Sequence, residues 1–387
     1  MQNIDLIIIG SGPAGISTAL HLLQGDPRWA GRMLLLEKAA HPRPKLCGGA
    51  ITRLGLETLQ NLGFRLPPPV AHARVDDVRL LYRGRTVHVR GQPQLLIFHR
   101  AELDAYLAEQ AQQRGAVILQ NEPVMEITID SEGVNVRSQR ETYRAWAVVG
   151  ADGSKGLTHK LVQDHVGEAR VARLLETSQP APESASVFAE RFALFDFNPV
   201  QEDLQGYFWE FPSRVGGRAH FNRGIYDARR VPGRRADLPG TFKTLLRAQG
   251  QEPTQAHIEG HPLHWFSPRS RFAIPRLLLA GDAAGVDGLF GEGIAPALAY
   301  GQIAAQAVQE AFAREDFSFS DYRQRVLRSQ LGQYLLVRWC VAWWGYHFGQ
   351  IPWFMHLVWT LGMAASNLWP QPEPLLQKAI DRPLAET

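Results

Sequence analysis

The spacing of three glycines near the N-terminus is the first chemical signal in the sequence. Gly10, Gly12 and Gly15 form a G-x-G-x-x-G motif between an apolar run at 4–9 and a segment of helical character at 16–23. The first glycine makes the turn, the second lets the backbone approach a pyrophosphate, and the third lets helix and strand pack closely. The pyrophosphate then lies at the N-terminus of the helix. The residues predicted to form this cradle are Gly10, Gly12, Pro13, Ala14 and Gly15.

An acidic residue follows this motif at the distance that a ribose requires. Glu37 comes directly after a second apolar segment, 33–36, and stands 22 residues after Gly15. A carboxylate at that point accepts hydrogen bonds from ribose hydroxyls and disfavours a 2′-phosphate. The pattern therefore predicts FAD or NAD rather than NADP, with Glu37 and the adjacent Lys38 at the cofactor. The order strand, helix, strand also predicts a parallel sheet.

The elements that must position these residues can be placed from their hydrophobic pattern. Helices are predicted at 101–114 and 293–315. The stretch 166–270 is rich in proline, arginine and aromatic residues, and we expect an antiparallel sheet with long loops there. Further strands are predicted at 74–97, 117–120, 124–130, 133–138, 146–150 and 277–280.

Two more motifs, each placed after an apolar strand, distinguish FAD from NAD. The first is Gly150-Ala151-Asp152-Gly153-Ser154, and the second is Gly281-Asp282, which precedes Gly291-Glu292-Gly293-Ile294. With these motifs in this order the sequence resembles the flavoprotein monooxygenase-like superfamily. The resemblance implies FAD as cofactor and a fold like that of p-hydroxybenzoate hydroxylase. It assigns cofactor contacts to the second and third motifs at Asp152, Gly281 and Asp282.

The same resemblance assigns roles to individual residues. Asp282 would bond a hydroxyl of the ribityl chain or of the nearby ribose, and Gly293 and Ile294 would offer backbone N–H groups to the flavin ring. Arg100 matches the arginine that contacts the pyrophosphate–ribityl region. Val124 matches the backbone position next to adenine.

Two local motifs narrow the resemblance further. Lys45-Leu46-Cys47-Gly48-Gly49-Ala50 and Tyr207-Phe208-Trp209-Glu210-Phe211-Pro212 are similar to the KxCGxx and YxWxFP segments of the geranylgeranyl reductase family. The resemblance covers about residues 1–315 in motif order. In that family reduced FAD saturates C=C bonds of isoprenoid chains. The resemblance places Cys47, Gly48, Gly49 and Ala50 beside the isoalloxazine, and the aromatic strand along an apolar substrate tunnel.

Both motifs also have plainer interpretations. Cys47 could pack on the flavin or relay a proton as a catalytic residue, or it could be a small buried apolar side chain, as free cysteines often are. Tyr207, Trp209 and Phe211 alternate on a predicted strand and therefore share one face. That face suits a lipid tail as substrate, and it also suits an ordinary aromatic core.

Taken together, the motifs predict an FAD-dependent reductase that transfers hydride from reduced flavin to an isoprenoid double bond. The sequence holds no second G-x-G-x-x-G motif, so we expect NAD(P)H to dock transiently or a ferredoxin to act as the electron-donor protein. The alternative is a monooxygenase, a hydroxylase or epoxidase of a lipid or aromatic substrate. Gly288 keeps it open, because relatives carry proline there on the substrate side of the flavin. A flavin halogenase and a non-catalytic lipid-binding flavoprotein are weaker alternatives.

The C-terminal region differs in character from the rest of the chain. Residues 339–372 include six tryptophans and no Asp, Glu, Lys or Arg. Polar residues near the middle of this run favour two helices, 334–348 and 352–367, over a single membrane span. Such helices could meet a membrane surface or form a lipid portal, since tryptophan favours the headgroup level. They could also be buried core or dimer helices.

Composition limits the remaining possibilities. The 387 residues are 45% hydrophobic and 20% charged, which excludes a disordered or fibrous chain. A net charge of +3 gives no basis for nucleic-acid binding, and two cysteines exclude a disulfide scaffold or a cysteine-rich metal site. No metal is predicted. The N-terminus has no basic segment of a secretory signal, so we expect a cytoplasmic protein, peripheral at the inner face of the membrane if the C-terminal helices meet lipid.

These observations predict the fold class and the domains. We expect an α/β protein (α+β overall), with a Rossmann-type FAD domain, an antiparallel-sheet substrate domain and a helical C-terminal region. The predicted FAD-binding domain is discontinuous. Its segments are 1–66, 95–165 and 270–315, those of the substrate domain are 67–94 and 166–269, and the aromatic-rich C-terminal region is 316–387.

Overall fold

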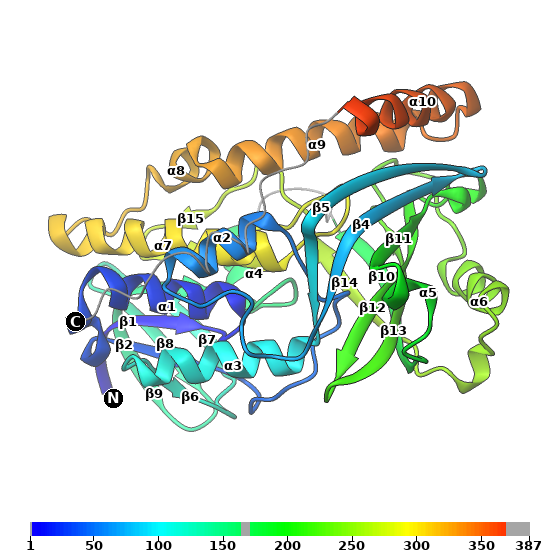
Figure 1. The fold of residues 1–387 in the computed structure, drawn as a ribbon. Coiled ribbons are helices and arrows are strands. Elements are labelled where there is room, and N and C mark those ends of the chain that lie inside the picture. Colours follow the sequence, from blue (N-terminus) through cyan, green and yellow to red (C-terminus); the bar gives the residue numbers. More distant parts are fainter. Residues whose placement is uncertain (1, 164–170, 369–387) are drawn as a thin grey trace.

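A mostly parallel sheet carries the glycine motif (Figure 1). The computed structural model describes residues 2–163 and 171–368. The strands of this sheet are β1 Gln2–Ile9, β2 Met33–Leu36, β6 Val117–Leu119, β7 Val124–Ile129, β8 Val134–Ser138, β9 Thr142–Gly150, β15 Ala273–Ile274 and β16 Leu277–Leu279. The parallel strands follow the order β16-β9-β1-β2-β6, with β15 at the edge and the hairpin β7–β8 joined through β9.

The central strands form a parallel sheet because they are apolar on both faces. Ile8 is fully buried and pairs with Leu35 on one side and Val149 on the other. Continuous apolar runs are typical of parallel strands that are covered on both faces. Helix α1 (Pro13–Gly25) opens with a proline, whose fixed φ suits the first helical position. It packs against α3 (Arg100–Gln113) and α7 (Ile294–Arg314).

A second eight-stranded sheet contains the aromatic strand. Its strands are β3 Ala50–Ile51, β4 His72–Tyr82, β5 Arg85–Phe98, β10 Val171–Pro180, β11 Phe192–Asp196, β12 Gly206–Val215, β13 Arg218–Asp227 and β14 Glu259–His264. Their order is β14-β10-β13-β12-β11-β4-β5-β3, and all neighbours are antiparallel except β11 and β4. The short strand β3 begins at the end of the Cys-Gly-Gly segment and pairs with β5, so this segment lies at one edge of the second sheet.

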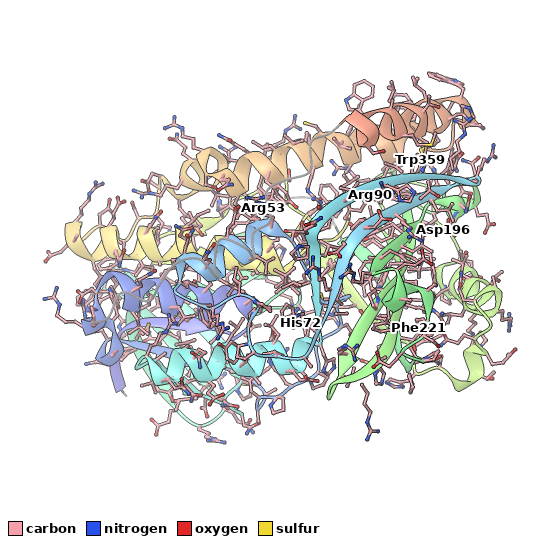
Figure 2. The ribbon with its side chains drawn as sticks, in the orientation of Figure 1. Arg53, His72, Arg90, Asp196, Phe221 and Trp359 are labelled. Carbon is pink, nitrogen blue, oxygen red and sulfur yellow. The ribbon has the colours of Figure 1, made fainter. Side chains whose placement is uncertain are left out.

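The C-terminal helices run along one side of the molecule, over both sheets (Figure 1). They are α8 (Tyr322–Arg328), α9 (Gln330–Phe348) and α10 (Pro352–Leu368). Trp359 of α10 donates its indole N–H to the carbonyl of Leu80 at 3.0 Å, which ties α10 to the second sheet (Figure 2). Within 2–163 and 171–368, no helix combines the length and apolar character that crossing a bilayer requires.

The structure confirms the predicted α/β class, both C-terminal helices, and the strands and helices around the glycine motif. It adds the helix α6 (Leu238–Ala248), which was not predicted. Asp237 caps this helix by accepting a hydrogen bond from the Gly240 N–H at 3.2 Å, and an Asp before a proline-containing first turn is a recognisable helix start. The other helices are η1 Pro27–Gly31, α2 Arg53–Asn61, α4 Leu157–Gln163, α5 Ser186–Ala189, η2 Asn198–Glu202, η3 Pro253–Gln255 and η4 Gly281–Ala283.

The domain boundaries stay a prediction. Segments 164–170 and 369–387, on which parts of the predicted domains fall, lie outside the described residues.

The contact between α1 and α7 yields a test of the fold. A Cβ on Gly301 of α7 would lie 2.5 Å from the Cβ of Ser17 and 2.7 Å from the backbone N of Thr18 in α1. We expect Gly301→Ala to force the helices apart and destabilise the protein by about 1–3 kcal/mol. Denaturant unfolding measures this difference.

Gly345 in α9 provides the matched control, because no atom lies within 4 Å of a Cβ placed there. Gly345→Ala should stabilise the protein by about 0.5–1 kcal/mol, since alanine favours a helix interior. Equal effects of the two substitutions would contradict the close packing of α1 on α7.

Candidate flavin site

The glycine turn is crowded at Gly10 and Gly15 and has free space at Gly12. Gly10 has a φ of +100°, and a Cβ there would lie 2.4 Å from the carbonyl oxygen of Ala151. A Cβ on Gly15 would lie 1.9 Å from the carbonyl oxygen of Gly10. At Gly12 the nearest atom to such a Cβ is Nη2 of Arg43, 3.5 Å away. No side chain caps α1 at Gly12, so the first turn can present its N–H groups to a phosphate.

Glu37 is 3% exposed and lies beside this turn. Its Oε2 accepts hydrogen bonds from the Ser11 backbone N–H at 2.9 Å and from the Ser11 hydroxyl at 3.0 Å, and lies 3.3 Å from Nη2 of Arg43. Burial acts to raise the pKa of Glu37, but the Arg43 charge and the Ser11 hydrogen bonds hold the pKa below its ordinary value. An ionised carboxylate at this place suits a pair of ribose hydroxyls.

Arg100 and Arg43 meet at one buried carboxylate, that of Asp104. Arg100 donates to it through Nε at 2.9 Å and Nη2 at 2.8 Å, and Nη1 of Arg43 lies 3.6 Å from it. Burial lowers the pKa of Arg100, whereas Asp104, Cys47 and Asp282 raise it above its ordinary value. The Arg100 guanidinium therefore stays charged. Arg43 lies against Gly12, so that both guanidinium groups could face a pyrophosphate.

Lys45, the first residue of the cysteine motif, links this region to the Gly-Asp motif. Its Nζ lies 3.5 Å from Oδ2 of Asp282 and 3.2 Å from Nε2 of His261. Burial and the Lys45 charge lower the pKa of His261 to about 4, so its ring is neutral at pH 7. Asp282 also lies near the start of α7, because a Cβ on Gly293 would be 3.3 Å from its Oδ1.

The loop 287–293, which leads into α7, is held by a buried ion cluster. Asp287 is fully buried, caps the loop by accepting from two backbone N–H groups within it, and lies 2.7 Å from Nη1 of Arg338 in α9. Glu292 accepts a hydrogen bond from Thr52 at 2.6 Å and another from Tyr334, and lies 3.6 Å from Nη2 of Arg338. Three tyrosines also donate to carbonyl groups of this loop. They are Tyr207, Tyr226 and Tyr346.

The remaining predicted cofactor residues occupy different surroundings. Asp152 accepts hydrogen bonds from the backbone N–H of Thr158 at 3.0 Å and from its hydroxyl, at the start of α4. Its carboxylate is thus engaged within the chain, and burial raises its pKa. Val124 begins β7, close to the end of β2, because the Glu122 N–H donates to the Glu37 carbonyl at 2.8 Å.

The aromatic face of β12 lies against the Cys-Gly segment. Tyr207, Trp209 and Phe211 are buried in one apolar cluster, and a Cβ on Gly48 would lie 2.9 Å from Cε2 of Phe211. The side chain of Cys47 is half-buried, and burial raises the pKa of its thiol above the ordinary value. The Arg100 charge and the Gly49 backbone N–H oppose this rise in pKa, but burial outweighs them, so Cys47 is a neutral thiol at pH 7.

A polar group that was not predicted lies on this same face of the sheet. Asn222 of β13 accepts a hydrogen bond from the indole N–H of Trp209 at 2.7 Å and donates to Glu176 of β10 at 2.8 Å. It also donates weakly to the Cys47 carbonyl at 3.4 Å. The Cys-Gly segment, the aromatic strand and a buried acid thus form one hydrogen-bonded unit.

Comparisons with known proteins agree with this geometry. Residues 3–287 match the model of a protein family described as FAD binding domain. The chain belongs to this family. It is an FAD-dependent oxidoreductase, and its glycine turn, Glu37 and the uncapped start of α1 fit the cofactor.

Several of the named relatives are reductases of geranylgeranyl compounds. The chain is 27% identical over 345 residues to digeranylgeranylglycerophospholipid reductase 2 of Methanopyrus kandleri, a match that covers 82% of this chain and 80% of that protein. It is 26% identical over 340 residues to the chloroplastic geranylgeranyl diphosphate reductase of Arabidopsis thaliana, covering 80% of this chain and 66% of that protein.

Solved structures share the fold at lower identity. A geranylgeranyl bacteriochlorophyll reductase-like protein of Thermoplasma acidophilum has a TM-score of 0.73 and 19% identity, over 88% of this chain and 87% of that one. The p-nitrophenol 4-monooxygenase PnpA of Pseudomonas putida has a TM-score of 0.68 and 17% identity, over 98% and 97%. At these identities the likeness concerns the fold alone.

The structure brings most of the predicted cofactor residues to one region, and their roles stay predictions. Sequence reasoning missed three groups in it: Arg43, Asp104 and Arg338. Arg43 stands six residues after Glu37, and a cation so close in sequence to the predicted ribose-binding acid could have indicated it. Arg338 comes from a helix far along the chain, and no local pattern marks it.

The open side of Gly12 can be tested directly. Gly12 has ordinary backbone angles and room for a side chain, so Gly12→Val should fold but obstruct the approach of a pyrophosphate. We expect FAD affinity to fall at least about tenfold, which corresponds to about 1.4 kcal/mol. Gly31→Val is the control, because a Cβ there meets no atom within 4 Å. Titration of each flavin-free variant with FAD measures its affinity for the cofactor. Unchanged affinity in Gly12→Val would refute this placement of the pyrophosphate.

Proposed function

We propose that this protein saturates C=C bonds of an isoprenoid chain, using hydride from reduced FAD. The observation that carries the proposal is the buried aromatic face of β12 against the Cys47-Gly48 segment, next to the residues that fit FAD. Relatives named as geranylgeranyl and digeranylgeranylglycerophospholipid reductases support the same substrate class.

The residues of the aromatic face are suited to hold an apolar chain. When bound and reduced, FAD supplies a hydride to an alkene carbon. The hydroxyl of Tyr207 donates to the Phe290 carbonyl and the indole N–H of Trp209 donates to Asn222, so both polar groups point into the protein's own hydrogen bonds. What these side chains offer to a ligand is therefore their apolar ring surface, which excludes water from the alkene.

The electron source is part of the proposal. The chain has one G-x-G-x-x-G motif, and FAD accounts for it. We propose that a transiently bound NAD(P)H or a ferredoxin reduces the flavin.

A monooxygenase is the second candidate. Gly288 favours it, since proline is expected there and its absence loosens the loop on the substrate side. In this structure, however, the Tyr226 hydroxyl donates to the Gly288 carbonyl at 3.3 Å and Arg338 holds the neighbouring Asp287. These contacts restrain the loop without proline, so the reductase remains the better-supported function. The flavin halogenases carry WxWxIP where this chain has Tyr207-Phe208-Trp209-Glu210-Phe211-Pro212.

Product mass separates these functions. The holoprotein, reduced with dithionite without oxygen, is mixed with geranylgeranyl diphosphate and an isoprenoid lipid extract. We expect products heavier by pairs of hydrogen atoms, and we expect Trp209→Ala to retain FAD but lose most of this turnover. Gain of one oxygen atom after air is admitted, with no hydrogen gained before, would identify a monooxygenase instead.

We also propose that the outer face of α9 and α10 meets a lipid surface. Trp353 is 67% exposed and Val337 63% exposed, although both are apolar. Arg83 and Arg85 lie at the turn between β4 and β5, and Arg85 donates to Thr360 of α10 at 2.8 Å. Exposed tryptophan beside arginine suits the headgroup level of an anionic membrane. The other exposed apolar residues of this face are Val341, Trp343, Trp344, Leu357, Val358 and Leu361.

Vesicle sedimentation tests this face. We expect the holoprotein to pellet with vesicles that contain phosphatidylglycerol, and the double variant Trp344→Ser, Trp353→Ser to pellet much less. Trp146→Ser is the matched control, because Trp146 is 50% exposed but lies on β9 of the first sheet. Equal sedimentation of the three proteins, or none, would refute the lipid surface.

A further inference from the structure

Glu176 is a buried acid that lies on the same sheet face as the aromatic residues. It is 7% exposed, and its neighbour two residues before, Leu174, belongs to the apolar cluster that contains Trp209. Residues two apart on a strand share a face. The strand register places Glu176 opposite Gly224, and Gly224 opposite Trp209, so these three form one row across β10, β13 and β12.

The Trp209 indole occupies the space above the middle of this row. A Cβ on Gly224 would lie 2.1 Å from Cζ2 of Trp209, so the Trp209 ring extends over β13 toward Glu176. A chain that contacts the Trp209 ring is therefore brought close to the carboxyl group. One oxygen, Oε1, is fixed by Asn222 at 2.8 Å. Within the described part of the chain, the other oxygen, Oε2, has no hydrogen-bond partner although it is buried.

The surroundings of Glu176 favour its protonated form. Burial raises the pKa of Glu176 to about 7, against the opposing effects of the Asn222 hydrogen bond, the Cys47 backbone and the Arg100 charge. Glu259, opposite it on β14, raises the pKa further. His261 on the same strand is neutral at pH 7, and Lys45 pairs with Asp282. A carboxyl group that is half protonated at neutral pH is well matched to general acid catalysis.

We propose that Glu176 is the proton donor of the reduction, placed by Asn222 so that Oε2 protonates the alkene held on the Trp209 ring. This inference rests on the proposed function. The C=C π bond breaks, one carbon gains the hydride supplied by reduced FAD, and the other gains the proton of Glu176. The alkene is thereby reduced by two electrons and the flavin oxidised by two, and the carboxylate regains its proton from water. Cys47 then shapes the wall of the site and need not supply the proton.

Single-turnover reoxidation of the reduced holoprotein by geranylgeranyl diphosphate, without oxygen, tests this role. We expect the wild-type rate to fall above about pH 7 with the loss of one proton. Glu176→Gln keeps the Asn222 hydrogen bond, and it should slow the step about a hundredfold and remove this pH dependence. Glu176→Asp keeps a carboxyl group on a shorter side chain, and its rate should lie between those of Glu176→Gln and wild type. FAD affinity should be the same in all three proteins.

Thermal unfolding gives a readout that is independent of turnover. The pKa of Glu176 is about 7 in the folded state and near 4.5 in the unfolded state. At pH values between these two, the folded state therefore binds more protons than the unfolded state. Its contribution to stability is therefore lost as pH rises from about 4.5 to about 7. Glu176→Gln should unfold at a higher temperature than wild type at pH 8 and should lack this decline. Glu259→Gln is the matched control. Glu259 is exposed and raises the pKa of Glu176 only as a neighbouring charge, so this variant should keep the decline, moved to lower pH, and most of the rate.

The outcomes separate this proposal from the function on which it rests. If wild type gives no hydrogenated product, both the reductase function and the role of Glu176 are refuted. If wild type reduces the lipid and Glu176→Gln does so at the same rate and with the same pH profile, only the role of Glu176 is overturned. Loss of the pH dependence in Cys47→Ala, but not in Glu176→Gln, would assign the proton to the cysteine instead.

Discussion

The arrangement of the site depends on one buried ion cluster, in which Arg338 of α9 lies between Asp287 and Glu292. Two carboxylates that are nearly inaccessible to water would be costly to ionise without a cation, and breaking such a pair typically costs roughly 3–5 kcal/mol. Because both acids lie in the loop that precedes α7, this cost holds the loop against the C-terminal helices. Helix α9, which carries the exposed Trp343 and Trp344, is thereby joined to the loop beside the candidate flavin site.

A second group of charges, around Asp104, lies beside the glycine turn that we predict to bind an anionic cofactor. Arg43 and Arg100 share Asp104, and Arg43 also contacts Glu37, so each cation is held by an acid of the chain. These ion pairs therefore fix the position of both guanidinium groups without a ligand. They lie beside Gly12 and an uncapped helix start, where phosphate oxygens could add to existing hydrogen bonds without reorganisation.

The aromatic face of β12 combines apolar rings with one group of polar contacts. Trp209 and Tyr207 direct their polar atoms to Asn222 and the Phe290 carbonyl, so that their rings lie in the apolar cluster where we propose that a hydrophobic chain binds. Glu176 is an acid on this same face. An apolar wall with such an acid suits the proposed saturation of an alkene, because the burial that excludes water also raises the pKa of the acid toward neutral pH.

The sequence alone was sufficient to predict the Rossmann-type sheet, the glycine turn, the position of Glu37 after the second strand, and the aromatic strand. Each of these features depends on residues that are close together in the chain. Strand periodicity, a proline at the first helical position and a fixed glycine spacing are local consequences of backbone sterics. Only the tertiary structure revealed Arg338 at Asp287 and the row from Glu176 to Trp209. These contacts join residues 51 and 33 positions apart, and their pairing is decided by strand register and by the desolvation of buried charge. Neither strand register nor the desolvation of buried charge can be read from a short stretch of sequence. Both are decided only when segments that are distant in the chain pack together and exclude water.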